Sequence, residues 1–223
     1  MFDILRASLF TGEDVSLPDW EPVFTEMKQQ TVAALPCMWL QTQPDAKPWL
    51  SYCRLQQARW IRVMHAQDQL LDLLETQDIP CVIIKGAAAA MAYPYPTLRL
   101  MGDVDFLVKR TDFEKAAALL EENGYALAHE KNSASHHYGY SKDRIRFELH
   151  KRIPLVAESN EKWMTFFENG IDKREWRETE GHRFPVLPPV LTRICESCGY
   201  TVEGGWFRGR DGVGKKAGGI SAV

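Results

Sequence analysis

The chain has 223 residues, 45% of them hydrophobic, which is enough for one ordinary domain or for one domain with an appendage. Its 27 basic and 30 acidic residues give a formal net charge of −3, which argues against a surface built entirely for nucleic acid. No apolar run reaches the roughly 20 residues of a membrane span, the first ten residues do not resemble a secretory signal, and five cysteines are too few for a disulfide scaffold. We therefore expect a cytoplasmic protein with reduced thiols and no membrane partner.

Residues 1–77 are expected to form an N-terminal helical segment. Apolar residues such as Trp60, Leu70 and Leu74 recur at helical spacing with polar residues between them, which predicts an amphipathic helix over 49–76. A shorter helix is expected earlier, over 21–34.

Residues 78–152 alternate short apolar strands with helices and are expected to form the catalytic core. Thr111 is the expected cap of the second helix, and Lys142-Asp143 is the expected tight turn between the last two strands. The expected strands cover 80–84, 103–108, 125–129, 138–141 and 144–150, and the expected helices cover 86–92 and 112–122.

Residues 153–223 are less regular. A helix is expected over 161–168 and a strand over 183–186, and seven of the last twenty residues are glycine, which predicts a poorly packed tail. Cys195 and Cys198 form half of a zinc-knuckle motif, but no second pair follows at a suitable spacing, so we expect neither a metal nor a redox role for them.

Two aspartates lie on one strand of the expected core. Along residues 103–108, Val104 and Phe106 should point into the interior, whereas Asp103 and Asp105 should point to the opposite face, about 7 Å apart. Two carboxylates so close repel each other unless a cation or hydrogen bonds hold them, and Mg²⁺ or Mn²⁺ is the simplest partner. A D-x-D triplet alone is common on solvated faces, so its neighbours decide the interpretation.

A third acid, Glu148, lies on the polar face of the strand over 144–150. If this strand lies beside the first, three carboxylates converge, as a two-metal site for phosphoryl transfer requires. An equally open alternative is that Glu148 pairs with Arg144 or Arg146. His150 shares the face of Glu148 and could orient an acceptor or bind the metal, whereas His136-His137 is interpreted as an ordinary loop or strand start.

The turn at Lys85-Gly86 joins a buried strand directly to a helix. Backbone N–H groups at such a junction favour phosphate, glycine permits close approach, and Lys85 adds a positive charge. Arg99, just before the aspartates, could neutralise a triphosphate. The alternatives are a simple turn, a solvated lysine and an arginine paired with an acid.

Together these motifs resemble the uncharacterised bacterial nucleotidyltransferase-like family, a branch of the DNA polymerase beta nucleotidyltransferase superfamily, over about residues 60–188. The resemblance implies an α+β fold, in which a small mixed sheet carries helices packed on it and follows the N-terminal helical segment. It implies Mg²⁺-dependent transfer of a nucleoside monophosphate from an NTP to an acceptor, which is a small molecule, a protein or an RNA. Asp103, Asp105 and Glu148 match the family's catalytic and metal-binding acids, and Gly86 matches the glycine of its phosphate-holding turn.

The chain departs from the wider superfamily at one position. Ala87 follows Gly86, where a serine usually helps to hold the phosphates, so nucleotide binding would depend on Lys85 or Arg99. This departure keeps a second interpretation open, namely a nucleotide-binding or regulatory module without turnover. A third, a metal-dependent glycosyltransferase, would need a larger nucleotide-binding half before the D-x-D.

Overall fold

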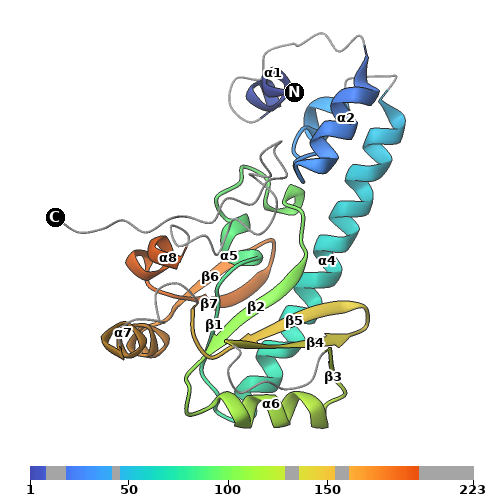
Figure 1. Ribbon diagram of the computed structural model, residues 1–223. Coiled ribbons are helices and arrows are strands. Elements are labelled where there is room, and N and C mark those ends of the chain that lie inside the picture. Colours follow the sequence, from blue (N-terminus) through green and yellow to red (C-terminus); the bar gives the residue numbers. More distant parts are fainter. Residues whose placement is uncertain (9–18, 42–45, 129–135, 154–160, 196–223) are drawn as a thin grey trace, which may run out of the picture.

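A mixed sheet of five strands forms the centre of the structure, a computed structural model that describes residues 1–8, 19–41, 46–128, 136–153 and 161–195 (Figure 1). The strands are arranged in the order β1-β2-β5-β4-β3 across the sheet. β2 and β5 run parallel, whereas the other neighbouring strands run antiparallel. The bounds are Cys81–Ile83 for β1, Asp103–Val108 for β2, Ala126–Leu127 for β3, His137–Lys142 for β4 and Ile145–His150 for β5.

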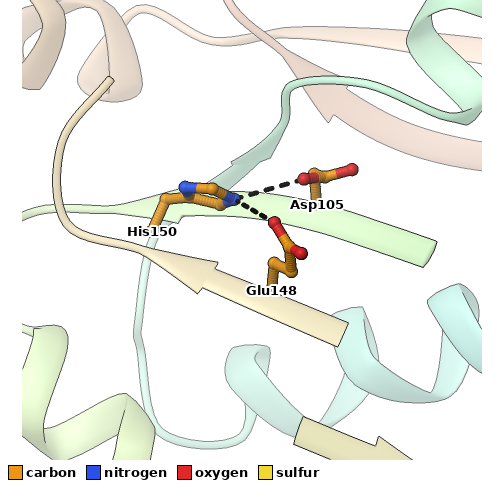
Figure 2. Close-up of side chains that lie close together, drawn as sticks. All are labelled: Asp105, Glu148 and His150. Atoms are coloured by element: carbon orange, nitrogen blue, oxygen red, sulfur yellow. Dashed lines mark hydrogen bonds and ion pairs between the residues drawn. The ribbon is translucent and has the colours of Figure 1, made fainter. Parts of the chain in front are cut away.

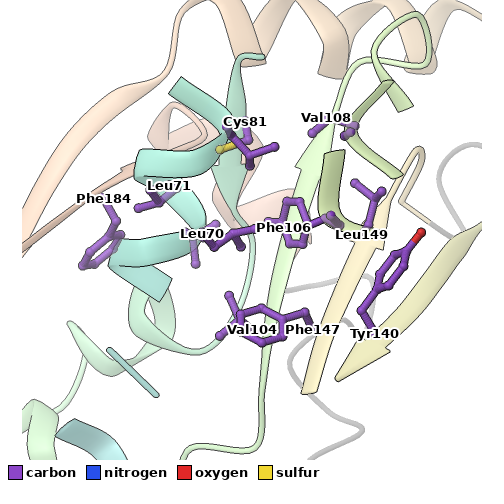
Figure 3. Packing of buried hydrophobic residues seen from close by; sticks show 14 of the residues in the cluster. Leu70, Leu71, Cys81, Val104, Phe106, Val108, Tyr140, Phe147, Leu149 and Phe184 are labelled. Carbon is purple, nitrogen blue, oxygen red and sulfur yellow. The ribbon is translucent and has the colours of Figure 1, made fainter. Parts of the chain in front are cut away.

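The main core lies between one face of this sheet and two helices, α4 (Lys47–Glu75) and α6 (Phe113–Glu122). Val104, Phe106 and Val108 all point into this core, because alternate side chains of a strand share a face. Figure 3 shows them between the leucines of α4 and the aromatic side chains of β4 and β5. The amphipathic helix predicted from the apolar spacing is therefore confirmed.

A second, smaller core covers part of the opposite face. Val82, Ile84 and Leu107 point to that side and pack against two helices, α7 (Glu161–Asp172) and α8 (Pro189–Cys195). The helix expected near residue 161 is thus present and continues one turn further than predicted. Since helices pack on a small mixed sheet, the expected α+β class is confirmed.

The N-terminal helices form a third cluster around Trp49, at the start of α4. This cluster includes Leu98, which belongs to a short 3-10 helix that leads towards β2. The N-terminal segment therefore supports the backbone just before the aspartates. Its helices are α1 (Phe2–Arg6), α2 (Trp20–Gln29) and α3 (Cys37–Leu40), and the 3-10 helix η2 spans Pro96–Leu98.

A two-stranded hairpin of β6 (Glu175–Thr179) and β7 (His182–Val186) contacts β1 and α4 through β7. β7 was expected over 183–186. β6 was not expected, because its side chains are mostly exposed or half-buried and it shows no apolar alternation.

Two predicted boundaries in helices are wrong for local reasons. The helix expected over 21–34 ends at Gln29, where Thr31 adopts a positive φ of 59° and the Val32 N–H donates to the Met27 carbonyl. This is the hydrogen-bond pattern of a Schellman motif, which usually carries glycine, so a threonine gave no signal. The cap of α6 is Asp112 rather than Thr111, and its side chain makes no capping hydrogen bond.

Three further predictions in the core are displaced or too long. The hairpin turn consists of Asp143 and Arg144, both with positive φ, and lies one residue later than expected, so each residue of β4 pairs two positions further along β5 than expected. Such a turn usually contains Asn or Gly, which this chain lacks here. The helix expected over 86–92 is the single turn α5 (Ala87–Ala90), and only 126–127 of the strand expected over 125–129 pairs as β3.

Within the described ranges, no helix has the length and apolar character needed to cross a membrane. Cys37, Cys53 and Cys81 are buried and free. The expectations for Cys198 and for the glycine-rich tail fall on residues outside those ranges.

Candidate active site

Asp105 and Glu148 lie side by side on neighbouring strands. In the parallel pairing of β2 and β5, Asp105 stands directly opposite Glu148, so the condition on which the three carboxylates would converge is met. Because residues two apart share a face, Asp103 and Asp105 lie on the side of Leu107, away from the main core. The three acids named by the sequence therefore share one patch of the sheet.

His150, at the end of β5, contacts both carboxylates (Figure 2). Its Nε2 lies 3.2 Å from Asp105 Oδ1 and 3.3 Å from Glu148 Oε2. His150 and Asp105 are each only 1% exposed, whereas Glu148 is half-buried. The sequence placed His150 on the face of Glu148, and the structure shows that its ring reaches between the two acids.

The pKa values of this cluster reflect mutual stabilisation. The hydrogen bond from His150 is the largest influence on Glu148 and, against the effect of burial, lowers its pKa to about 2. Burial by itself would lower the pKa of His150, but its hydrogen bonds to Asp105 and Glu148 outweigh burial and raise it. A protonated His150 thus supplies positive charge to two carboxylates that would otherwise repel each other.

The cluster also has the donor set of a divalent-cation site. Asp105, Glu148 and His150 each offer one ligand atom, and these atoms lie within 4.8 Å of one another. Asp105 Oδ2 is buried and has no hydrogen-bond partner among the residues that the structure describes, which is costly unless a ligand approaches it. Carboxylate oxygens suit Mg²⁺ or Mn²⁺, and an imidazole nitrogen adds affinity for a transition metal. The residues therefore fit a divalent metal ion.

Asp103 stands at the edge of this cluster. Its Oδ2 lies 3.8 Å from Nη2 of Arg146, its register partner on β5. The sequence left open whether Glu148 joins the aspartates or pairs with Arg144 or Arg146. In the structure Glu148 contacts His150, and Arg146 pairs with Asp103 instead. Burial, followed by the negative charges of Asp105 and Glu148, raises the pKa of Asp103, so its ionised form is poorly compensated.

The Lys85-Gly86 turn lies against the start of β2. Lys85 Nζ is 3.4 Å from Asp105 Oδ1, the same oxygen that His150 contacts. Gly86 has φ 56° and ψ −108°, and a Cβ at this position would lie 3.4 Å from Met101 Cε and 3.5 Å from the Asp103 carbonyl oxygen. Glycine is needed here because side chains rarely adopt this backbone conformation. The turn expected to hold phosphate is therefore adjacent to the carboxylates.

Two arginines support the segment that leads into β2. Arg99 Nη1 donates to the Leu100 carbonyl at 3.2 Å, and burial lowers the pKa of Arg99 despite the opposing influence of Tyr93 and the aspartates. Arg59, on α4, donates from Nε to the Met101 carbonyl at 2.6 Å and from Nη2 to the Gly102 carbonyl at 3.0 Å. The sequence did not single out Arg59, because a helical arginine beside an apolar stripe usually faces solvent.

Two further histidines lie next to His150. His137, the first residue of β4, is its antiparallel partner, with ring centroids 5.1 Å apart, and the His136 ring lies 4.5 Å from that of His137. Burial is the main cause that lowers the pKa of both, to about 4 for His136. The pair lies at a strand start, as the sequence predicted. With the hairpin turn at Asp143-Arg144, the antiparallel pairing of β4 and β5 puts His137 opposite His150. A correct prediction of the turn would therefore have placed both histidines near the site.

Comparison with known proteins gave one match. The model of a family described as uncharacterised nucleotidyltransferase matches residues 17–193, which include the sheet, the carboxylates and most of the helices. No curated protein and no solved structure matches the chain significantly.

Proposed function

This chain belongs to the family of uncharacterised nucleotidyltransferases, and we propose that it transfers a nucleoside monophosphate from an NTP to an acceptor, with release of pyrophosphate. The observation that carries this proposal is the register pair of Asp105 and Glu148, with one buried carboxylate oxygen of Asp105 lacking a described donor. A buried, incompletely satisfied carboxylate in a cluster of ligand atoms is typical of a site that receives a cation.

In the proposed mechanism, Asp105 and Glu148 would hold Mg²⁺ or Mn²⁺, and Asp103, on the same face of β2, would contribute a further carboxylate to a two-metal site. Bound divalent ions would stabilise the negative charge that develops on the attacking and leaving oxygens during in-line displacement. The poor compensation of Asp103 in the metal-free protein favours this role, because its carboxylate gains most from an added cation.

Glu148 is better suited to bind metal than to deprotonate the acceptor. A pKa of about 2 leaves its carboxylate ionised at neutral pH but makes it a weak base, far from the range in which proton transfer is efficient. We assign proton removal from the acceptor to another group or to solvent.

The phosphates are proposed to lie along the turn at Gly86, with Lys85 and Arg99 supplying positive charge. At Gly86 a backbone without a side chain lies against the start of β2. The acceptor is a small molecule, a protein or an RNA, and its identity is the question that follows from a positive result below.

A second candidate, a module that binds nucleotide without turnover, is favoured by one observation. Ala87 is fully buried and packs in the main core, so this position offers no hydroxyl to the phosphates. The charge of Lys85 would then have to replace the missing contact of a serine hydroxyl with the phosphates. This charge would be sufficient to bind the nucleotide, but it would align the reacting phosphate less well than a hydroxyl does.

The test combines binding with turnover. Each NTP and a UDP-sugar are added with and without Mg²⁺ or Mn²⁺, and both the melting temperature and pyrophosphate release are measured with small hydroxyl acceptors, RNA and protein extract. We expect a metal-dependent NTP shift and pyrophosphate release in the wild type, both absent in Asp105→Asn and retained in Asp143→Asn. Asp143 lies in the exposed hairpin turn, where asparagine tolerates the positive φ, so it controls for the same chemical change.

Three results would contradict the proposal in different ways. An NTP shift without pyrophosphate release from any acceptor supports the binding module. A shift with the UDP-sugar alone supports the glycosyltransferase. Full activity in Asp105→Asn would show that the carboxylate cluster is not the active site.

A further inference from the structure

Lys85 and His150 approach the same oxygen of Asp105. Lys85 Nζ lies 3.4 Å from Asp105 Oδ1 and His150 Nε2 lies 3.2 Å from it. Asp105 is 1% exposed, so its charge is compensated by protein groups rather than by water. The carboxylate that would bind a divalent ion is thus already in contact with the Lys85 ammonium group.

We propose that Lys85 is an exchangeable counter-ion: a divalent metal displaces its ammonium group from Asp105, and the released ammonium group then binds the phosphates of the NTP. This inference rests on the proposed function, because it assumes that metal and NTP meet at Asp105. It assigns to one side chain two successive partners, a carboxylate before substrate binds and a phosphate afterwards.

The first half of the exchange follows from charge. A metal ion coordinated by Asp105 would lie within a few ångströms of the Lys85 ammonium group, and two cations on one carboxylate repel each other. His150 can remain as a ligand if its nitrogen is deprotonated, whereas the Lys85 ammonium group carries no lone pair and has to leave. Lys85 is therefore the cation that the metal replaces.

The second half follows from position. Lys85 directly precedes Gly86, and the Gly86 turn lies against Met101 and the Asp103 carbonyl, where the phosphates are proposed to lie. A lysine has a flexible stem that can turn its ammonium group from one anion to another nearby, in contrast to the planar fork of arginine. Arg99 is more constrained, since its guanidinium group contacts Leu100 and Met101.

The decisive variant is Lys85→Met, which removes the charge and keeps most of the stem. Lys109→Met is its matched control, because Lys109 is also ion-paired, to Asp172 at 2.5 Å, at the other end of β2 from the aspartates. Mn²⁺ binding without nucleotide is measured by electron paramagnetic resonance of the free ion. Binding of a non-hydrolysable NTP analogue is then measured at saturating Mn²⁺.

We expect changes of opposite sign in Lys85→Met: Mn²⁺ binds about tenfold more tightly, and the NTP analogue binds about tenfold more weakly. Lys109→Met should change neither affinity. Weaker analogue binding with unchanged Mn²⁺ affinity would overturn the exchange and leave Lys85 as a simple phosphate ligand. If both affinities equal those of the wild type, Lys85 is only a structural partner of Asp105.

A measurement on the unmodified protein covers the case in which Lys85→Met does not fold. The rate of lysine acetylation by a water-soluble activated acetyl ester is followed by peptide mass spectrometry, with Lys109 as the internal reference. Lys85 should react faster when Mn²⁺ is added and more slowly when Mn²⁺ and the NTP analogue are both present. An unchanged rate with Mn²⁺ overturns the exchange.

Failure of the proposed function gives a distinct result. If the wild type binds no NTP analogue with any divalent metal, the proposed function and the exchange both fall. If the wild type binds both ligands but Lys85→Met lacks the opposite-sign response, only the exchange falls.

Discussion

Asp103 and Asp105 point to the same face of β2, two residues apart, yet they differ in their cationic partners. Asp105 is buried against Lys85 and His150, whereas Asp103 is half-buried and its ion-pair partner Arg146 is exposed and 3.8 Å away. The burial of Asp103 and the two neighbouring acids raise its pKa, which means that its ionised form opposes folding of the metal-free protein. The two aspartates therefore differ in their contribution to stability although both are proposed to bind metal.

The first prediction is that the two amide substitutions move metal-free stability in opposite directions. Asp103→Asn should raise the free energy of unfolding by about 1 kcal/mol, because it removes a repelled charge. Asp105→Asn should lower it by about 3 kcal/mol, because it takes the carboxylate away from the partly buried Lys85 and the buried His150. Urea unfolding in the presence of a chelator measures both values.

Addition of Mg²⁺ or Mn²⁺ supplies the control for this prediction. The ion should stabilise the wild type and leave both variants nearly unchanged, so the advantage of Asp103→Asn should shrink or reverse. Equal destabilisation by the two substitutions without metal would show that Asp103 is as well compensated as Asp105.

The second prediction concerns Arg59 as a residue that positions the backbone before Asp103. Arg59→Met removes the donors to the Met101 and Gly102 carbonyls and should lower the free energy of unfolding by about 2 kcal/mol. If Arg59 also positions Asp103, kcat in the proposed reaction should fall with little change in the KM for NTP, and Arg59→Lys should restore part of it.

The exposed Arg62, on the same helix, provides the comparison. Arg62→Met should leave both stability and kcat near the wild-type values. A loss of stability in Arg59→Met without any change in kcat of the folded fraction would reduce Arg59 to a purely structural contact.

The third prediction tests the contact between α7 and α8, which cover the sheet near Leu107. A Cβ built at Gly170 in α7 would overlap the side chains of Leu187 and Leu191. Gly170→Ala should therefore destabilise the protein by about 2 kcal/mol, although alanine has the higher helix propensity. Asn169→Ala, at an exposed position of the same helix, should be neutral or stabilising, and thermal unfolding distinguishes the two.

The strand that carries the aspartates could be predicted because its information is local. Val104, Phe106 and Val108 alternate with polar or opposite-facing positions, and this period fixes both the strand and the face of Asp103 and Asp105. The adjacency of Glu148 could be stated only as a condition, because parallel pairing joins segments that are far apart in sequence.

Other features could not be predicted because their signal is either absent or non-local. The turn at Asp143-Arg144 lacks the usual asparagine or glycine, and the resulting two-residue error in the expected partners hid the pairing of His137 with His150. The contact of Arg59 with two carbonyls depends on how α4 packs against the segment before β2, and no spacing within the helix encodes it.

The fourth prediction separates backbone strain at Gly86 from its role beside the carboxylates. Gly86→Ala places a side chain at φ 56° and ψ −108°, and its Cβ would touch Met101 and the Asp103 carbonyl. The substitution should cost on the order of 1–3 kcal/mol of stability, because a side chain is strained at this positive φ, and relief of that strain should change the backbone of the turn. Gly124→Ala is the matched control, since Gly124 also has a positive φ, of 80°, but no atom within 4 Å of its added Cβ.

We expect both variants to melt earlier than the wild type, while only Gly86→Ala weakens metal-dependent binding of an NTP analogue in titration calorimetry. Equal affinity in the two variants would place the phosphates elsewhere than on the Gly86 turn.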